Sequence, residues 1–245
     1  SKNTYFSLHT GINIDAGLGI PKDLFRFAMI GMDDQSSSTK FDMTSLNLET
    51  MVYSKTGVGF KSNIGEKVSI GIGVNYLQGL VNAKMYFDEL SIDASETQWN
   101  IISKGCLRIS GPEDFKLSYS EDGFLNGIQS NNSFNSSADY NSAFNSMSRV
   151  GSGLSFDFGL TIKPVRFLKL SASLVDLGSI TWNKDCVQKA NSNGSFTYDG
   201  AEFDITGGQK SEVSDLNINE GLEKLIHFEK SADVESYKSY LTARL

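Results

Sequence analysis

The sequence predicts an all-β protein: an antiparallel up-and-down transmembrane β-barrel, present only in part, with two short helices on the side of its long loops. Three observations predict this class. Apolar and polar residues alternate along several segments, the apolar fraction of the chain is low, and short connections alternate with long ones. Together they indicate a sheet that separates an apolar medium from a polar one.

The alternation is plainest in residues 68–76, VSIGIGVNY, where Ile70, Ile72 and Val74 share one side of an extended strand. Small or polar residues occupy the other side. The same pattern recurs in Phe6–Leu18 and Gly153–Ile162. Because successive side chains of a strand point to opposite faces, each segment must lie between an apolar and a polar environment.

Composition limits what that apolar environment is. Hydrophobic residues make up 39% of the 245 residues, below the roughly 45–50% of globular domains, so a large dry core is not expected. No apolar run approaches the ~20 residues that a membrane helix needs. Any membrane crossing would therefore use strands. A net charge of −7 with scattered basic residues excludes a nucleic-acid groove.

The first half of the chain divides at its turn-forming residues. A helix is predicted from Pro21 to Gly31, because proline favours the first turn of a helix and glycine its end. The other elements are a first strand, a polar loop, a long extended stretch, a tight turn, a long strand and two shorter strands: Phe6–Leu18, Ser36–Lys40, Phe41–Ile64, Asn63–Lys67, Val68–Phe87, Thr97–Ser110 and Phe115–Ser120.

The second half begins with an Asn- and Ser-rich loop at residues 127–148, predicted to be disordered because it has too little apolar surface to offset the entropy of ordering it. A second hairpin and shorter strand candidates follow: Gly153–Ile162, Leu168–Leu177, Ser179–Trp182, Ser195–Tyr198 and Phe203–Thr206. Residues 217–230 have helical spacing, with Asn217 and Glu220 placed as a capping box, and predict a helical cap. Tyr237–Leu245 is again extended.

The connections differ in length on the two sides of the predicted sheet. The turns at 63–67 and 163–167 are short, whereas the connections at 31–40, 111–152 and 185–236 are long and polar. Short turns on one side and long loops on the other are typical of outer-membrane barrels, whose long loops are extracellular.

Several segments also resemble a known family. PKDLFRFAMIG, FDMTSLNLET, VSIGIGVNYLQGLVNAKMYFDEL, SFDFGLTIKP and LSASLVDLGSITW resemble segments of an uncharacterised family of Bacteroidota outer-membrane β-barrel proteins. That family is similar to fatty-acid-transporter-type barrels and to barrel subunits of the type IX secretion system. The resemblance extends from about Tyr5 to Trp182. It implies a barrel in the bacterial outer membrane and brings no catalytic residues with it.

One departure from the family concerns the last strand. Barrels of this kind resemble one another in closing with a strand that ends in an aromatic residue, whereas this chain stops at Leu245 in what looks like the start of a strand. About eight strand candidates are counted by alternation. Residues 1–245 are therefore expected to form one β-barrel domain that is a fragment of a longer barrel, or one half of a split protein.

No catalytic or metal-binding motif is present. His9 and His227 are the only histidines, which excludes a multi-histidine zinc site, and no GxSxG, HExxH or P-loop occurs. Glycines at alternate positions, such as Gly71, are expected to relieve crowding inside a curved barrel. We therefore expect neither enzyme activity nor a cofactor. Cys106 and Cys186 do not form a CxxC motif, and are either a disulfide or two separate thiols.

Two groups of residues are candidates for function. The first is a set of polar residues expected to face the lumen and to be available for ligand binding: His9, Asn13, Asp15, Asn75 and Asp157. The second is the apolar part of the first helix, expected to pack as a lid or plug in the barrel mouth or to lie as a cap on the lipid interface: Leu24, Phe25, Phe27 and Met29.

These features predict a non-enzymatic outer-membrane barrel that passes a hydrophobic or small solute, or that serves as a barrel subunit of a secretion or assembly complex. Its expected partners are outer-membrane lipid and other subunits of an envelope complex, and not nucleic acid. The alternative is a secreted, soluble β-sandwich for binding or adhesion, whose apolar faces would pack against each other.

Overall fold

A computed structural model of the chain describes residues 4–30, 39–95, 98–121, 123–130, 149–165, 167–198 and 228–245. Ten strands form one antiparallel sheet, and two more form a separate hairpin. The prediction of an antiparallel, mostly β protein is confirmed. The closed barrel is not found: within the described residues the sheet is open, and no pairing joins its edge strands.

The strands are β1 (Thr4–Gly19), β2 (Thr39–Asp42), β3 (Asn47–Ile64), β4 (Val68–Ala94), β5 (Trp99–Ser110), β6 (Phe115–Tyr119), β7 (Leu125–Ser130), β8 (Gly151–Val165), β9 (Leu168–Trp182), β10 (Val187–Tyr198), β11 (Glu229–Lys230) and β12 (Tyr237–Tyr240). The described residues also hold one α-helix, α1 (Lys22–Ile30), and one 3-10 turn, η1 (Lys184–Cys186), which joins β9 to β10.

Strand β4 is the centre of the sheet. On one edge its first half, Val68–Gly79, pairs with β8 and its second half, Asn82–Ala94, pairs with β5. On the other edge it pairs with β3 and, near its end, with β2. Strand β1 pairs with β3, β9 with β8, and β10 with β5. One long strand therefore carries two sub-sheets end to end.

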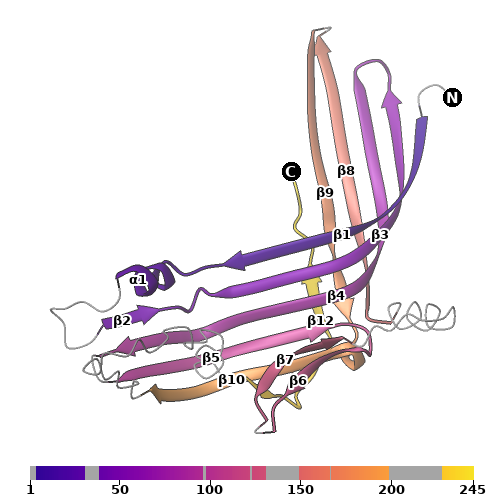
Figure 1. Cartoon of the computed structure of the whole chain (residues 1–245). Coiled ribbons are helices and arrows are strands. Elements are labelled where there is room, and N and C mark those ends of the chain that lie inside the picture. Colours follow the sequence, from indigo (N-terminus) through magenta and orange to yellow (C-terminus); the bar gives the residue numbers. More distant parts are fainter. Residues whose placement is uncertain are drawn as a thin grey trace, which may run out of the picture.

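The two sub-sheets point in different directions (Figure 1). We call the part built on the first half of β4, with β8, β9 and the adjoining halves of β1 and β3, the arm. The part built on β5, β10 and the remaining halves is the base. The β3/β4 ladder shifts register at Val52/Tyr53, near the bend, where Leu80 has no partner on β3. Such a bulge increases the local bend and twist of a strand.

The base has a hydrophobic core on one face. Helix α1, β2 and the β6–β7 hairpin contribute to it, and Phe41, Phe87 and Ile101 are buried. Leu24 and Phe27 of α1 pack against it, and the Phe27 ring lies 5.1 Å from that of Phe41 and 5.4 Å from that of Trp99. The helix predicted from Pro21 thus forms, and its apolar stripe contacts the base.

A second, smaller core lies at the bend on the opposite face. Tyr53, Leu77, Ile180 and Trp182 are fully or nearly fully buried there. Leu241, which follows β12, completes this cluster. The two cores lie on opposite faces of one sheet, so each half of the molecule is covered on a different side.

Several sequence predictions agree with the structure only in part. The extended stretch predicted at Phe41–Ile64 divides into the end of β2 and β3, with a turn between them. Of the loop at 127–148, residues 127–130 belong to β7, and 131–148 lie outside the described residues. Of the helix at 217–230, Glu229–Lys230 form β11 instead, and 217–227 lie outside the described residues. The strand expected at Ser195–Tyr198 is the end of the longer β10, and 203–206 are not described.

Candidate functional site

The arm has one apolar and one polar face, and the apolar face is uncovered. Exposed apolar side chains from all five of its strands share this face: Phe6, Leu8, Val58, Phe60, Ile70, Ile72, Val74, Leu154, Phe156, Phe158, Leu160, Leu168 and Leu170. In the base the same face of β4 carries the core that α1 and the β6–β7 hairpin help to form. Along β4 the arm therefore exposes the face that the base buries, whereas on β1 this face stays exposed through Ile12, Ile14 and Leu18.

On the two neighbouring strands β4 and β8 the exposed apolar surface of the arm forms a band of equal length. On β4 it extends over nine residues, Val68–Tyr76, and on β8 over nine residues, Leu154–Ile162, with an apolar residue at every second position. Apart from Val68, which is less exposed, the apolar residues of both segments have 37–52% of their surface exposed, for example 48% at Ile72 and 47% at Phe158. A tilted strand needs roughly 9–11 residues to cross a hydrocarbon layer.

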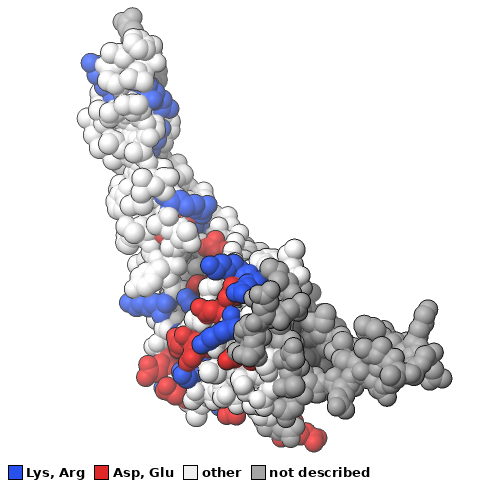
Figure 2. Space-filling model, turned by 90° about the vertical axis from the view of Figure 1, so that its left-hand side faces the viewer, with Lys and Arg blue, Asp and Glu red and all other residues white. Residues whose placement is uncertain are grey.

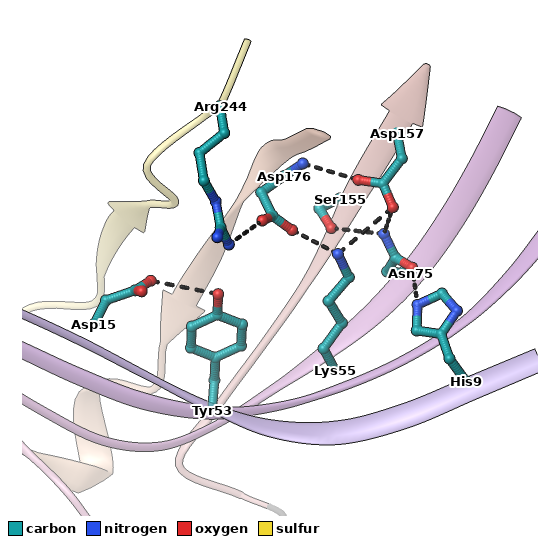
Figure 3. A network of polar contacts seen from close by, with 9 residues as sticks. All are labelled: His9, Asp15, Tyr53, Lys55, Asn75, Ser155, Asp157, Asp176 and Arg244. Carbon is teal, nitrogen blue, oxygen red and sulfur yellow. Dashed lines mark hydrogen bonds and ion pairs between the residues drawn. The ribbon is translucent and has the colours of Figure 1, made fainter. Parts of the chain in front are cut away.

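The polar face carries a connected network of hydrogen bonds and ion pairs (Figure 3). Asn75 of β4, fully buried, donates from Nδ2 to Asp157 Oδ2 at 2.9 Å and to Ser155 Oγ at 3.1 Å. Because an ionised carboxylate only accepts, this bond fixes the orientation of the Asn75 amide and turns Oδ1 toward His9. His9 Nε2 lies 2.9 Å from that oxygen, so Nε2 carries the proton.

Two aspartates form the charged centre of the network. Lys55 of β3 donates to Asp176 Oδ1 at 2.5 Å and lies 3.5 Å from Asp157 Oδ2. Arg244 Nη2 donates to Asp176 Oδ2 at 2.7 Å, and the Asp176 backbone N–H donates to Asp157 Oδ1 at 2.8 Å. All four carboxylate oxygens therefore have a donor, which is the condition for burying such charges without a large penalty.

Asp176 is placed by an irregularity in the β8/β9 ladder. The register shifts between Phe156 and Phe158, and Asp176 adopts a positive φ of 62°. Aspartate tolerates this left-handed conformation better than most non-glycine residues. The bulge turns the Asp176 side chain, only 4% exposed, toward Lys55 on the polar face.

Glycines make room for these side chains. A Cβ built on Gly57 would overlap the Asn75 amide and approach His9 Cε1 to 2.8 Å, and one on Gly73 would lie 3.2 Å from Asp157 Cβ. Toward the end of the arm Gly59, Gly71 and Gly159 have no side chain to project, and they help to line a groove of about 400 Å³ that begins at the network. The groove is also lined by polar residues, among them Ser7, His9, Lys61 and Ser173, and by apolar ones such as Tyr5, Phe60 and Val175.

Residues Phe228–Leu245, which we call the strap, connect base and arm across the bend. Phe228 packs with Phe87 in the core of the base, whereas Tyr237 contacts Arg108 and Asn82 on the opposite face, so the strap passes round the edge at β10. Strand β12 then pairs with the end of β9, and the strap reaches the network through Arg244.

Tyr237 is the best-anchored side chain of the strap. Its hydroxyl donates to Asn82 Oδ1 at 2.6 Å, lies 2.7 Å from Ser110 Oγ, and its ring stacks on Trp182 with centroids 6.3 Å apart. Burial raises the pKa of Tyr237 to about 12, because the buried site disfavours the phenolate. The side chain is neutral at physiological pH.

The structure brings together three of the five predicted lumen residues, His9, Asn75 and Asp157, in one network. Asp15 lies beyond it and accepts a 3.3 Å bond from the Tyr53 hydroxyl, and Asn13 is on the same face without joining the network. Lys55, Ser155, Asp176 and Arg244 were not predicted. Lys55 and Ser155 follow the same alternation and were open to prediction, but Asp176 depends on a bulge and Arg244 on the path of the strap.

The four apolar residues predicted to form the plug have different surroundings in helix α1. Leu24 and Phe27 pack against the core of the base, whereas Phe25 is 55% and Met29 82% exposed. Two of the four residues therefore contact the base, and the other two are exposed on the helix. Helix α1 lies at the far end of the base from the arm (Figure 1) and has no contact with the polar network.

The described residues also include the two cysteines, and they bear on metal binding and on membrane-spanning helices. Cys106 and Cys186 are both free thiols, which resolves the two possibilities in favour of separate cysteines. No group of three potential metal ligands is found in the described part of the chain. Among its helices, none is long and apolar enough to cross a membrane. The network itself is an ion-pair arrangement with its acceptors satisfied, and it contains no nucleophile hydrogen-bonded to a base.

Comparison with known proteins identifies the family of this chain. A family of unknown function, DUF5723, matches the chain over residues 1–245. Neither the curated proteins nor the solved structures include a significant match. Because the match spans the whole sequence, the open antiparallel sheet with its arm, base and strap is a structure of that family, and the chain belongs to DUF5723, a family of unknown function.

Proposed function

We propose that this chain forms part of the wall of a non-enzymatic β-barrel in the bacterial outer membrane, with the apolar face of the arm against lipid and the polar face toward a lumen. The observation that carries the proposal is the exposed band of nine-residue apolar faces on adjacent strands. Its height is that of a strand crossing a bilayer, and its composition is that of a lipid-facing surface.

The polar face supports the same orientation. Its buried charges are paired with each other and none is directed toward the apolar side. In a membrane, ionisable residues are tolerated where they face an interior or water-filled cavity and have partners. The glycine-lined groove of about 400 Å³ beside the network gives that interior free space along the arm.

The proposal requires further pairing at the sheet edges. Within hydrocarbon every backbone N–H and C=O needs a partner, yet the outer edge of β1 has none among the described strands. Four antiparallel pairings separate β1 from β9, so these two strands run in the same direction and cannot close an all-antiparallel barrel on each other. The strap runs antiparallel to β9 and supplies the direction that closure needs.

Of the two roles expected for such a barrel, the polar face favours passage of a small solute. The polar face carries the exposed side chains of Ser7, His9 and Lys61 along the groove, which suit a small polar solute better than a hydrophobic one. A role as a subunit of a secretion or assembly complex would need a protein interface, and no described feature marks one. Long loops would be extracellular and the short turns at the end of the arm periplasmic.

The sharpest test replaces Phe158, in the middle of the band, by lysine. On a water-exposed surface Phe158→Lys would change the free energy of unfolding by less than about 0.5 kcal/mol. Against lipid at mid-depth, the same change costs about 2–4 kcal/mol. The measurement is flotation of the full chain with phosphatidylcholine vesicles, together with its unfolding by urea. We expect wild type to float and Phe158→Lys to float poorly.

Ser173→Lys is the matched control, since Ser173 is exposed on the polar face beside Phe158's ladder partner Leu174. It should insert as wild type does. Heat-modifiable migration of the wild type on a gel is a second expected property. A wild type that stays at the bottom of the gradient, or a Phe158→Lys chain that behaves like Ser173→Lys, would favour the soluble sandwich.

A further inference from the structure

The far end of the arm carries a cluster of lysines. Lys67 follows the β3–β4 turn, and Lys163 and Lys169 flank the β8–β9 turn. All three are exposed. We call this group the tip lysines. In the described residues of the two turns the only acidic residue is Glu66, so the tip is cationic in a chain whose net charge is −7.

The two turns form one surface. The Lys163 backbone N–H donates to the Lys67 carbonyl at 2.7 Å, which joins the turns, and Val68 pairs with Ile162 next to them. Lys169 follows Leu168, the partner of Val165 across the second turn. Figure 2 shows Lys and Arg side chains at the end of the arm and no Asp or Glu there in that view.

The tip lysines differ from lysines elsewhere in the sheet. Lys55 pairs with Asp176, Lys84 with Glu49 and Lys104 with Glu89. None of the tip lysines forms an ion pair with a described residue. Their charge is not neutralised within the described fold, so it is available to an external anion.

The molecule that carries this anion must also be able to contact apolar side chains. Phe167, at the tip, is 92% exposed, and Ile64 is 57% exposed at the end of β3. Both adjoin the apolar band of the arm. A soluble anion gains nothing from these side chains, whereas a phospholipid supplies a phosphate for the lysines and acyl chains for the apolar residues.

We infer that the tip lysines bind the phosphate groups of anionic phospholipids at one surface of the membrane, while the band of the arm lies in the hydrocarbon. The inference rests on the proposed function and adds the class of lipid at one end of the barrel. It also gives the arm a fixed depth, because lysines at the boundary resist movement of the band in either direction.

The test uses vesicles of phosphatidylcholine alone and vesicles that also contain phosphatidylglycerol. The tip variant combines Lys67→Gln, Lys163→Gln and Lys169→Gln. The control variant removes the same charge from exposed lysines outside the arm, with Lys116→Gln, Lys184→Gln and Lys230→Gln. Insertion of the full chain into each kind of vesicle is measured by flotation at low and high salt.

We expect wild type and control to insert about tenfold better into the anionic vesicles at low salt, since each lysine near an anionic surface contributes up to about a fivefold gain. The preference should shrink at high salt. The tip variant should lose it and still insert into phosphatidylcholine. Equal preference in the tip and control variants overturns the inference and leaves the proposed function intact. Absence of insertion by wild type into any vesicle overturns both.

Discussion

Asp176 shows how one residue organises several elements. Its backbone N–H donates to Asp157, one carboxylate oxygen accepts from Lys55, and the other accepts from Arg244. Strands β3, β8 and β9 and the strap therefore meet at this residue. With 4% of its surface exposed, its charge is stable only because all of these partners are present.

Replacing Asp176 by asparagine removes the charge and keeps a side chain that tolerates its positive φ. Lys55 and Arg244 then lose their shared carboxylate. We expect the free energy of unfolding to fall by about 2–4 kcal/mol, somewhat less than for a fully buried pair because the Arg244 side chain is 65% exposed. Urea unfolding in detergent would measure the change.

Asp233→Asn serves as the control for this measurement. Asp233 pairs with Lys189 at 3.7 Å, but its side chain is 80% exposed, so its loss should cost at most a few tenths of a kcal/mol. Equal effects of the two substitutions would mean that the network contributes no more than a surface ion pair.

At the scale of elements, the strands of the arm pack closely because glycines face the network. Gly57 of β3 lies opposite His9 in the ladder, and a Cβ there would collide with the Asn75 amide and the His9 ring. Gly11, two residues further along β1, has nothing within 4 Å of the corresponding position. The two glycines belong to the same pair of strands but meet different surroundings.

Gly57→Ala is therefore expected to lower the free energy of unfolding by about 1–3 kcal/mol, the usual cost of overpacking. Gly11→Ala should be neutral or slightly stabilising, because it restricts the unfolded chain without a clash. Thermal or urea unfolding of both variants provides the comparison. If Gly11→Ala proves as costly as Gly57→Ala, steric contact with Asn75 and His9 is not the reason for glycine at position 57.

A comparison of the strands shows which of them the sequence predicts and which depend on their partners in the sheet. Strands β1, β4, β8 and β9 follow from alternation, because each has faces in two different environments. Strand β10, VQKANSNGSFTY, lacks such a pattern, and it is a strand because it pairs with β5 over its whole length. Similarly, His9, Asn75 and Asp157 follow from the polar face, whereas the approach of Arg244 depends on contacts between residues distant in sequence.

At the scale of the whole molecule, the strap determines how arm and base are joined. Without the strap, the two halves are connected by the strands β1, β3 and β4, which run through both, and by the turn η1, which joins β9 to β10. The strap adds contacts to both halves: Tyr237 with Asn82 and Ser110 in the base, and the Trp182 indole N–H donating to Ser239 at 3.0 Å. We expect these contacts to stabilise the angle between the halves.

Tyr237→Phe tests this connection, because it removes the hydroxyl and leaves the ring stacked on Trp182. We expect the free energy of unfolding to fall by about 1–3 kcal/mol at neutral pH, since Asn82 and Ser110 lose a buried partner.

The pKa of Tyr237 is raised from an ordinary value of 10.0 to about 12 in the folded chain, so the stability that this hydroxyl contributes is fully present below pH 10. It is lost as the pH rises through the folded pKa, because the unfolded chain releases the proton first. Urea unfolding of both chains between about pH 8 and 12 should show the wild type converging on the variant. Tyr240→Phe, at a residue 77% exposed on the same strand, should match wild type at neutral pH, and a pH-independent gap between wild type and Tyr237→Phe would contradict a buried, neutral Tyr237.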